Sequence, residues 1–218
     1  MAGYRLRDGL SFCRLGERSL FLDLHADRYF GLSPAIDGAF GKLIDGAGRG
    51  PEEDAALMRA QLVVPSAEDE LPRPCDFPAP VEMASRLASA PPSRTLVLAV
   101  LARRAIWTFR LRHRPLAANL GSLSCRKRSL VAKSIGPMAV TRLVEAYQRA
   151  SFLVSSHDQC LATSMSLMSD LLSLGIRADL ALGVKLNPFQ AHCWVQLDGT
   201  VVSDEVDAVR PFTPIHVI

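Results

Sequence analysis

The sequence predicts an α+β protein made of two parts joined by a linker. Its first 64 residues show short alternating strand patterns followed by helical periodicity. Residues 65–92 then hold seven of the fourteen prolines, a composition typical of a linker. Long helical patterns follow, and the last part has the pattern of a strand pair with a tight turn. We therefore expect a small unit at residues 1–64, a proline-rich linker at 65–93 and a larger domain at 94–218.

Three short strands are expected first in the N-terminal unit. Alternating side chains begin at Leu10 and lead into a turn at residues 16–17. A second strand is expected at 19–24, and a turn at 27–28 leads into a third strand at 29–32.

Two helices are expected after these strands. The first should start at Ser33, with Pro34 as the first helical residue, because proline is well suited to that position. The second should start at Pro51 and run through Leu57 and Leu62, which follow a helical period.

Two longer helices are expected in the middle of the chain, at residues 95–113 and from about 138 to 152. The apolar stripe of the first should comprise Leu98, Leu101, Ala105 and Phe109. We expect both helices to pack around a third helix that carries Cys160. Nothing in residues 95–150 carries chemistry by itself.

Cys160 is the first residue whose setting indicates chemistry. It follows a polar stretch at residues 155–159 and opens an apolar segment with helical periodicity. Ser156 is a candidate N-cap with Gln159 three residues later, which is a capping-box pattern. Cys160 would then lie in the first turn, where the helix dipole and unpaired N–H groups favour a thiolate.

A histidine and a carboxylate follow on two expected strands. Residues 189–197 have a strand pattern and carry His192, and a two-residue turn leads into a second strand, 200–204, that ends in Asp204. A thiol, a histidine that takes its proton and a carboxylate that orients the histidine form a catalytic set. The order and setting of these residues therefore predict a Cys-His-Asp site.

The register of this hairpin bears on the position of Asp204. With a two-residue turn at Asp198 and Gly199, His192 faces Glu205, and Asp204 lies on the other face of the sheet. We therefore expect a bulge or a one-residue slip that brings Asp204 to the face of His192.

The remaining cysteines are predicted to be structural, because free cysteines mostly behave as small buried apolar groups. They are Cys13, Cys75, Cys125 and Cys193. An alternative zinc site would use His157, Cys160, His192 and Cys193. These residues lack the paired spacing of zinc ligands, so we predict no metal and no directly bound cofactor.

Four short segments near the end of the chain carry a family resemblance. They are Cys160-Leu161, residues 175–180 with Gly183-Val184, residues 188–195, and Val202-Ser203-Asp204. Through them the last quarter to third of the chain resembles the transglutaminase-like peptidases of lasso peptide biosynthesis, the B proteins. The resemblance implies a papain-like, transglutaminase-like cysteine peptidase domain. In it Cys160 is the nucleophile, His192 the base and Asp204 the residue that orients the base.

The N-terminal unit carries a shorter motif, Asp-x-x-x-Asp-Arg-Tyr-Phe-x-Leu-Ser, at residues 23–33. With its strands and helices, the unit resembles the winged-helix module that recognises precursor leader peptides. Only about two helices fit before Pro65, where that module has three. The resemblance implies that a leader segment extends the sheet at the third strand and packs against a helix. The candidate leader-binding residues are Tyr29, Phe30, Leu57, Met58 and Leu62.

Together these resemblances imply a cysteine peptidase that removes the leader from a ribosomally made lasso peptide precursor. The implied partners are the leader and an asparagine-synthetase-like lasso cyclase, which closes the ring and is the component that uses ATP. Two other classes fit the same residues. One is an acyltransferase similar to transglutaminases or arylamine acetyltransferases, and the other is a leader-binding protein without catalysis.

Charge is unevenly distributed along the chain. Residues 1–92 carry a net charge of −4 and residues 93–218 one of +7, and residues 94–142 include 11 basic and no acidic side chains. This basic stretch indicates either a surface for an acidic peptide or partner, or a solvated helix face. We do not expect nucleic-acid binding, because no aromatic interleaving or reader motif accompanies it.

Cysteine content and apolar segments bear on the compartment. Five cysteines, an odd number without the spacing of a disulfide framework, are typical of a protein from a reducing environment. The N-terminus shows no signal-peptide pattern, and the longest apolar run, residues 96–102, is too short to cross a bilayer. We therefore expect a cytoplasmic protein with no membrane partner.

Overall fold

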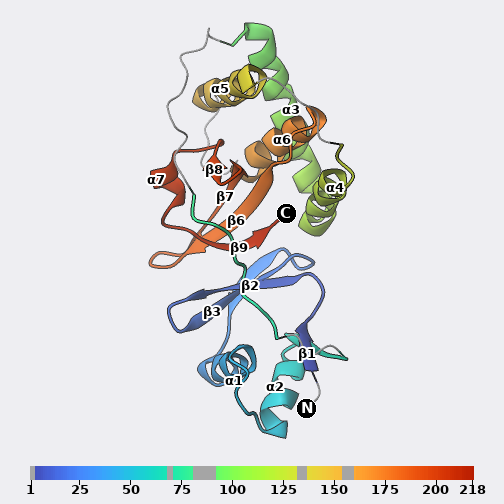
Figure 1. Ribbon diagram of the computed structural model, residues 1–218, viewed down its shortest axis with the longest axis vertical. Coiled ribbons are helices and arrows are strands. Elements are labelled where there is room, and N and C mark those ends of the chain that lie inside the picture. Colours follow the sequence, from blue (N-terminus) through green and yellow to red (C-terminus); the bar gives the residue numbers. More distant parts are fainter. Residues whose placement is uncertain (1–2, 68–70, 81–91, 132–136, 154–159) are drawn as a thin grey trace. The chain divides into compact units, whose positions relative to one another are not determined.

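The computed structural model describes residues 3–67, 71–80, 92–131, 137–153 and 160–218. The chain divides into two compact units (Figure 1). One comprises residues 1–77 with 213–216, and the other comprises 78–212 with 217–218. The division after Phe77 falls inside the segment predicted as a linker.

The N-terminal unit combines short antiparallel strands with two helices. Its elements in chain order are β1 (Gly3–Leu6), β2 (Leu10–Leu15), β3 (Arg18–Asp23), β4 (Arg28–Gly31), α1 (Pro34–Ile44), α2 (Pro51–Arg59) and β5 (Val63–Ser66). β2, β3 and β4 form one sheet in that order, and β1 pairs with β5.

The three predicted strands and both helices are confirmed, whereas the β1–β5 pair was not predicted. The expected extension of the second helix through Leu62 is wrong, because α2 ends at Arg59. The winged-helix assignment stays a prediction.

Local sequence explains the turns between the strands of this sheet. Gly16 has a φ of 65° in the turn from β2 to β3, a conformation that glycine adopts at little cost. Before β4, the Asp23 carboxylate accepts hydrogen bonds from the backbone N–H groups of His25 and Ala26, each at 3.0 Å. The first aspartate of the motif at residues 23–33 therefore shapes the turn that leads into β4.

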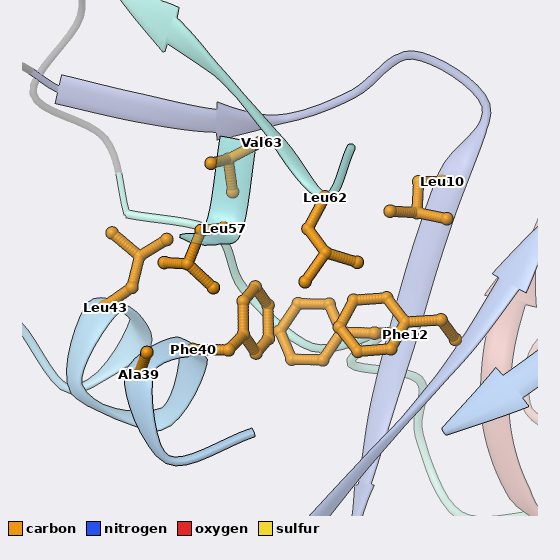
Figure 2. Close-up of a cluster of buried hydrophobic side chains, with 9 residues drawn as sticks. Leu10, Phe12, Ala39, Phe40, Leu43, Leu57, Leu62 and Val63 are labelled. Carbon is orange, nitrogen blue, oxygen red and sulfur yellow. The ribbon is translucent and has the colours of Figure 1, made fainter. Parts of the chain in front are cut away.

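An aromatic core holds this sheet to the helices. Phe12 and Phe21 stack with ring centroids 5.6 Å apart, and Phe40 of α1 meets them edge-on at 4.9 and 5.0 Å. Figure 2 shows Phe40 beside Phe12, with Leu57 and Leu62 in the same cluster. Both leucines are fully buried. Their burial moves them from the leader-binding candidates to the core of the unit.

The second half of the chain combines helices with a four-stranded sheet. Its elements are α3 (Arg94–His113), α4 (Leu116–Arg128), α5 (Pro137–Leu153), α6 (Cys160–Ser173), β6 (Asp179–Lys185), β7 (Gln190–Leu197), β8 (Thr200–Val201), α7 (Val206–Val209) and β9 (Thr213–Val217). The strand order is β8-β7-β6-β9. The helices expected in the middle of the chain are confirmed as α3 and α5, and the strand that carries His192 is confirmed as β7. No helix among the described residues has the length and apolar content needed to cross a membrane.

α6 is the central helix of this half. It contacts α3, α4 and α5 as well as strands β6 and β7, and Figure 1 shows it in orange among them. A polar cluster joins three of these helices. The Tyr147 hydroxyl of α5 lies 2.6 Å from Ser166 Oγ and 2.8 Å from Asp170 Oδ2, and Arg103 Nε of α3 lies 2.8 Å from the same carboxylate oxygen. Because buried polar groups need partners, the cluster favours one arrangement of α3, α5 and α6.

The buried face of α3 is not the predicted one. Leu98 and Phe109 are 65% and 63% exposed, whereas Val100, Arg104 and Trp107 are buried. α3 carries apolar side chains around much of its circumference, so periodicity alone did not select the packed face. Contacts with α5 and α6 selected it instead.

Candidate active site

α6 is described from Cys160 to Ser173, so this thiol lies at the amino end of the described part of the central helix. The first N–H groups of a helix have no intrahelical acceptor, and with the helix dipole they stabilise a thiolate at this end. Cys160 is a free, half-buried cysteine. The predicted cap, Ser156 with Gln159, lies outside the described residues.

β7 carries His192, and the imidazole ring meets Asp204. His192 Nε2 lies 3.0 Å from Asp204 Oδ2. The Cys160 side chain lies close enough to the ring to contribute to the pKa of His192. Because the carboxylate engages Nε2, Nδ1 is the ring nitrogen that remains for proton exchange with the thiol. The structure thus brings the three predicted residues together.

The chain reaches Asp204 by leaving the hairpin early. Asp198 and Gly199 both have positive φ, 48° and 82°, as a type I′ turn requires. β8 pairs with β7 in the expected register, but it ends at Val201. The expected strand to residue 204, with its bulge or slip, is therefore wrong. Strand alternation no longer dictates the face of Asp204, because the ladder has already ended.

Ser203 completes the edge of β7 with its side chain. Val202 N–H donates to the Val195 carbonyl at 2.9 Å, and Val195 N–H donates to Ser203 Oγ at 2.9 Å. The hydroxyl supplies an acceptor that a longer strand would supply from its backbone, so the chain turns away without leaving Val195 N–H unpaired. Asp204 follows directly and reaches His192. Our sequence reasoning missed Ser203, although a serine just before the carboxylate was an available signal.

The pKa of His192 is raised to about 9. Burial by itself lowers this pKa, but hydrogen bonds with Asp204 and Cys160, and the negative charges of these groups, outweigh burial. An imidazolium at neutral pH stabilises a neighbouring thiolate and can protonate a leaving group.

Ser164 ties α6 to the strand that carries His192. It lies one helical turn beyond Cys160, on the same side of α6. Its buried hydroxyl donates to the Cys193 carbonyl at 2.8 Å. This bond fixes the position of α6 along β7, so that Cys160 lies beside His192. The sequence held no signal for it, because a serine within a helix does not indicate its partner.

A glycine makes room for the rings that flank His192. Gly183 of β6 pairs with His192 of β7. The rings of Phe212 and Trp194 lie 5.2 and 6.3 Å from the imidazole. A Cβ atom at Gly183 would lie 2.5 Å from Trp194 Cζ3 and 3.1 Å from Phe212 Cβ. A larger residue must therefore displace these rings, which help to hold the imidazole.

We expect Gly183→Ala to lower the free energy of unfolding by about 1–3 kcal/mol, because overpacking shifts the Trp194 ring. The rate of Cys160 alkylation by iodoacetamide should fall about threefold as the imidazole is displaced. Thermal unfolding and peptide mapping measure the two effects. Gly121→Ala is the matched control, because a Cβ there meets nothing within 4 Å. Wild-type stability and alkylation in Gly183→Ala would show that the rings do not position His192.

Cys160, His192 and Asp204 line one cavity of about 550 Å³. Gln148 and Phe152 line it from α5. The volume lies within the range of pockets that enclose small ligands or a few residues of a peptide.

The other cysteines have different surroundings. Cys193 is fully buried, and burial raises its pKa well above the usual value. Burial raises the pKa of Cys13 to about 12. Cys125 is exposed. Within the described ranges, no three His, Cys, Asp or Glu side chains group to hold a metal, and His157 of the zinc alternative lies outside those ranges.

The remaining leader-binding candidates lie on β4 and α2. Tyr29 and Phe30 belong to β4, one of the two outer strands in the order β2-β3-β4. Phe30 is half-buried and stacks on Phe21 with centroids 5.3 Å apart. Met58 is 39% exposed.

A family model described as the transglutaminase-like superfamily matches residues 96–217. This chain belongs to the transglutaminase-like superfamily. The matched transglutaminase-like domain includes Cys160, His192 and Asp204, together with Ser164, Gly183 and Ser203 around them. Comparison with curated proteins and with solved structures gave no match.

Proposed function

We propose that this protein is a cysteine peptidase that removes the leader from a ribosomally made lasso peptide precursor. The observation that carries the proposal is the 3.0 Å contact between His192 and Asp204 in a cavity that Cys160 also lines. Membership of the transglutaminase-like superfamily supports acyl chemistry at a cysteine. The resemblance to lasso B proteins supports the choice of substrate.

The proposed reaction transfers the leader acyl group to water. The Cys160 thiolate adds to the scissile carbonyl carbon, and the Cys160 backbone N–H donates to the oxyanion. His192 gives its proton to the leaving amine as the C–N bond breaks, which leaves a thioester on Cys160. Neutral His192 then takes a proton from water as the water oxygen attacks the thioester. The leader departs with a carboxylate, and the thiolate–imidazolium pair is restored.

The N-terminal unit is proposed to hold the leader during this reaction. The leader would add a strand at β4, with Tyr29, Phe30 and Met58 among the contacts. The freed amino terminus of the core would pass to an asparagine-synthetase-like cyclase, which uses ATP. The steps proposed for this chain itself require no cofactor.

The test is to incubate the 218-residue chain with a lasso precursor peptide, with and without an asparagine-synthetase-like cyclase and ATP. In ¹⁸O-labelled water, mass spectrometry should find a leader carboxylate with one labelled oxygen and an unmodified core peptide. Transfer of the leader to an added amine would favour an acyltransferase. Leader binding without any cleavage would favour a non-catalytic binding protein. Either result would replace the peptidase proposal.

We expect Gly31→Pro to weaken leader binding about tenfold. The backbone of Phe30 pairs with Phe21 of β3, so the N–H of the next residue, Gly31, lies on the outer side of β4, and proline removes this donor. Fluorescence anisotropy of a labelled leader measures the affinity. Gly31→Ala keeps the N–H group, and its Cβ meets nothing within 4 Å, so it is the control and should weaken binding less. Circular dichroism must show that both variants remain folded. Equal affinities for both variants would argue against strand addition at this position.

A further inference from the structure

An apolar groove lies between α3 and α5. Figure 1 shows these helices side by side, and they are in contact. The groove has a volume of about 510 Å³ and is lined by Val97, Leu98 and Leu101 of α3 and by Phe152 and Leu153 of α5. Leu98, Phe152 and Leu153 are 65%, 89% and 68% exposed. Contiguous exposed apolar side chains typically mark a binding surface.

The groove adjoins the catalytic cavity, because Phe152 lines both of them. A chain that lies in the catalytic cavity and passes Phe152 therefore reaches the groove. This shared residue favours an occupant that is part of the molecule that reacts at Cys160.

Two guanidinium groups add a charge requirement. Arg94 of α3 and Arg149 of α5 line the groove beside its apolar floor, and both are exposed. In the described part of the chain, neither has an ion-pair partner among the salt bridges that the structure shows. Arg94 belongs to residues 94–142, which hold 11 basic and no acidic residues, and Arg149 lies beyond that stretch. An acidic side chain within an apolar segment complements this lining.

We infer that the α3–α5 groove is a substrate subsite. It binds the segment of the polypeptide substrate next to the scissile bond, and it selects apolar residues together with an acidic one. This inference rests on the proposed peptidase function and adds a chemical preference to it. It also assigns a role to the exposed apolar face of α3 and to part of the basic stretch.

The test uses the full-length protein and the precursor peptide of the cleavage assay. Leu98→Glu should lower kcat/KM about tenfold, because a charge replaces an apolar contact. Phe109→Glu is the matched control, since Phe109 lies on the same helix and is 63% exposed but does not line the groove. Its kcat/KM should stay within about twofold of the wild-type value. Iodoacetamide alkylation of Cys160 should be unchanged in both variants.

A charge exchange tests the acidic preference. Arg149→Glu should lower kcat/KM for the natural precursor about fivefold, whereas Arg142→Glu, two turns earlier on α5, should not. Replacing the acidic residues that flank the cut site by lysine should restore cleavage by Arg149→Glu and impair cleavage by the wild type. Unchanged kcat/KM in both groove variants, with cleavage that still requires Cys160, would overturn the subsite and leave the peptidase function intact. Altered oligomeric state in Leu98→Glu would also overturn it, because the groove would then be an interface between copies.

Discussion

Replacing Cys160 by alanine should abolish cleavage of the precursor and leave the fold and leader binding unchanged. In the proposed reaction the Cys160 thiolate forms the covalent bond to the substrate, and no other described cysteine lines the cavity. His192→Ala should be equally damaging, because members of a catalytic set act as a unit. We expect each change to lower kcat/KM by at least about a thousandfold. Timed mass spectrometry of the precursor measures the loss.

Cys125→Ala is the matched control for this prediction, because Cys125 is an exposed free cysteine outside the site. It should cleave the precursor like the wild type. The same cysteine also makes alkylation informative. Cys125 is exposed, whereas Cys160 is partly buried and so less accessible to iodoacetamide. Faster alkylation of Cys160 at neutral pH must therefore reflect a more reactive thiol and not easier access. Cleavage by Cys160→Ala, or preferential alkylation of Cys125, would contradict the assignment.

Replacing Asp204 by asparagine should lower kcat/KM by about one to two orders of magnitude and change its pH dependence. Because the pKa of His192 is raised to about 9, the imidazolium is present below that pH and is lost above it. Wild-type kcat/KM should therefore decline as the pH rises through about 9. Asparagine removes the negative charge beside His192, so the alkaline decline should move to lower pH. Initial rates across a pH series measure this shift.

Two neighbouring carboxylates provide controls. Asp207 has a side chain that is 88% exposed and pairs with Arg210, so Asp207→Asn should keep the wild-type pH profile. Glu205 lines the cavity but has no hydrogen bond with His192. If Asp204→Asn kept full turnover while Glu205→Gln or Asp207→Asn lost it, the orienting role would belong to that residue instead.

Local chemistry in the sequence was enough to determine many elements of this protein. Pro34 at the first helical position indicated α1, and Asp198-Gly199 indicated the turn after β7. The helical period of the apolar residues after Cys160 indicated α6. Each of these features depends on backbone preferences within a few residues, which neighbouring residues in the chain largely decide. For the same reason Cys160 and His192 were recognisable from their settings alone.

Only the tertiary structure decided how the site is assembled and which faces are buried. Asp204 reaches His192 because Ser203 pairs with Val195, and the local hairpin rule predicted another face for Asp204. Ser164 and Gly183 act through contacts with β7 that lie far from them in sequence. Such contacts leave no periodic signal in the chain.

Contacts distant in sequence also decided which faces of the helices are buried. α3 exposes Leu98 and buries Arg104, and α2 ends before Leu62, which joins the aromatic core. The apolar pattern of α3 fits more than one buried face, and that of α2 fits more than one end of the helix. The sequence pattern alone therefore did not decide between these possibilities. Contacts between segments distant in the chain made that choice, because burial is a property of the assembled core and not of any one helix.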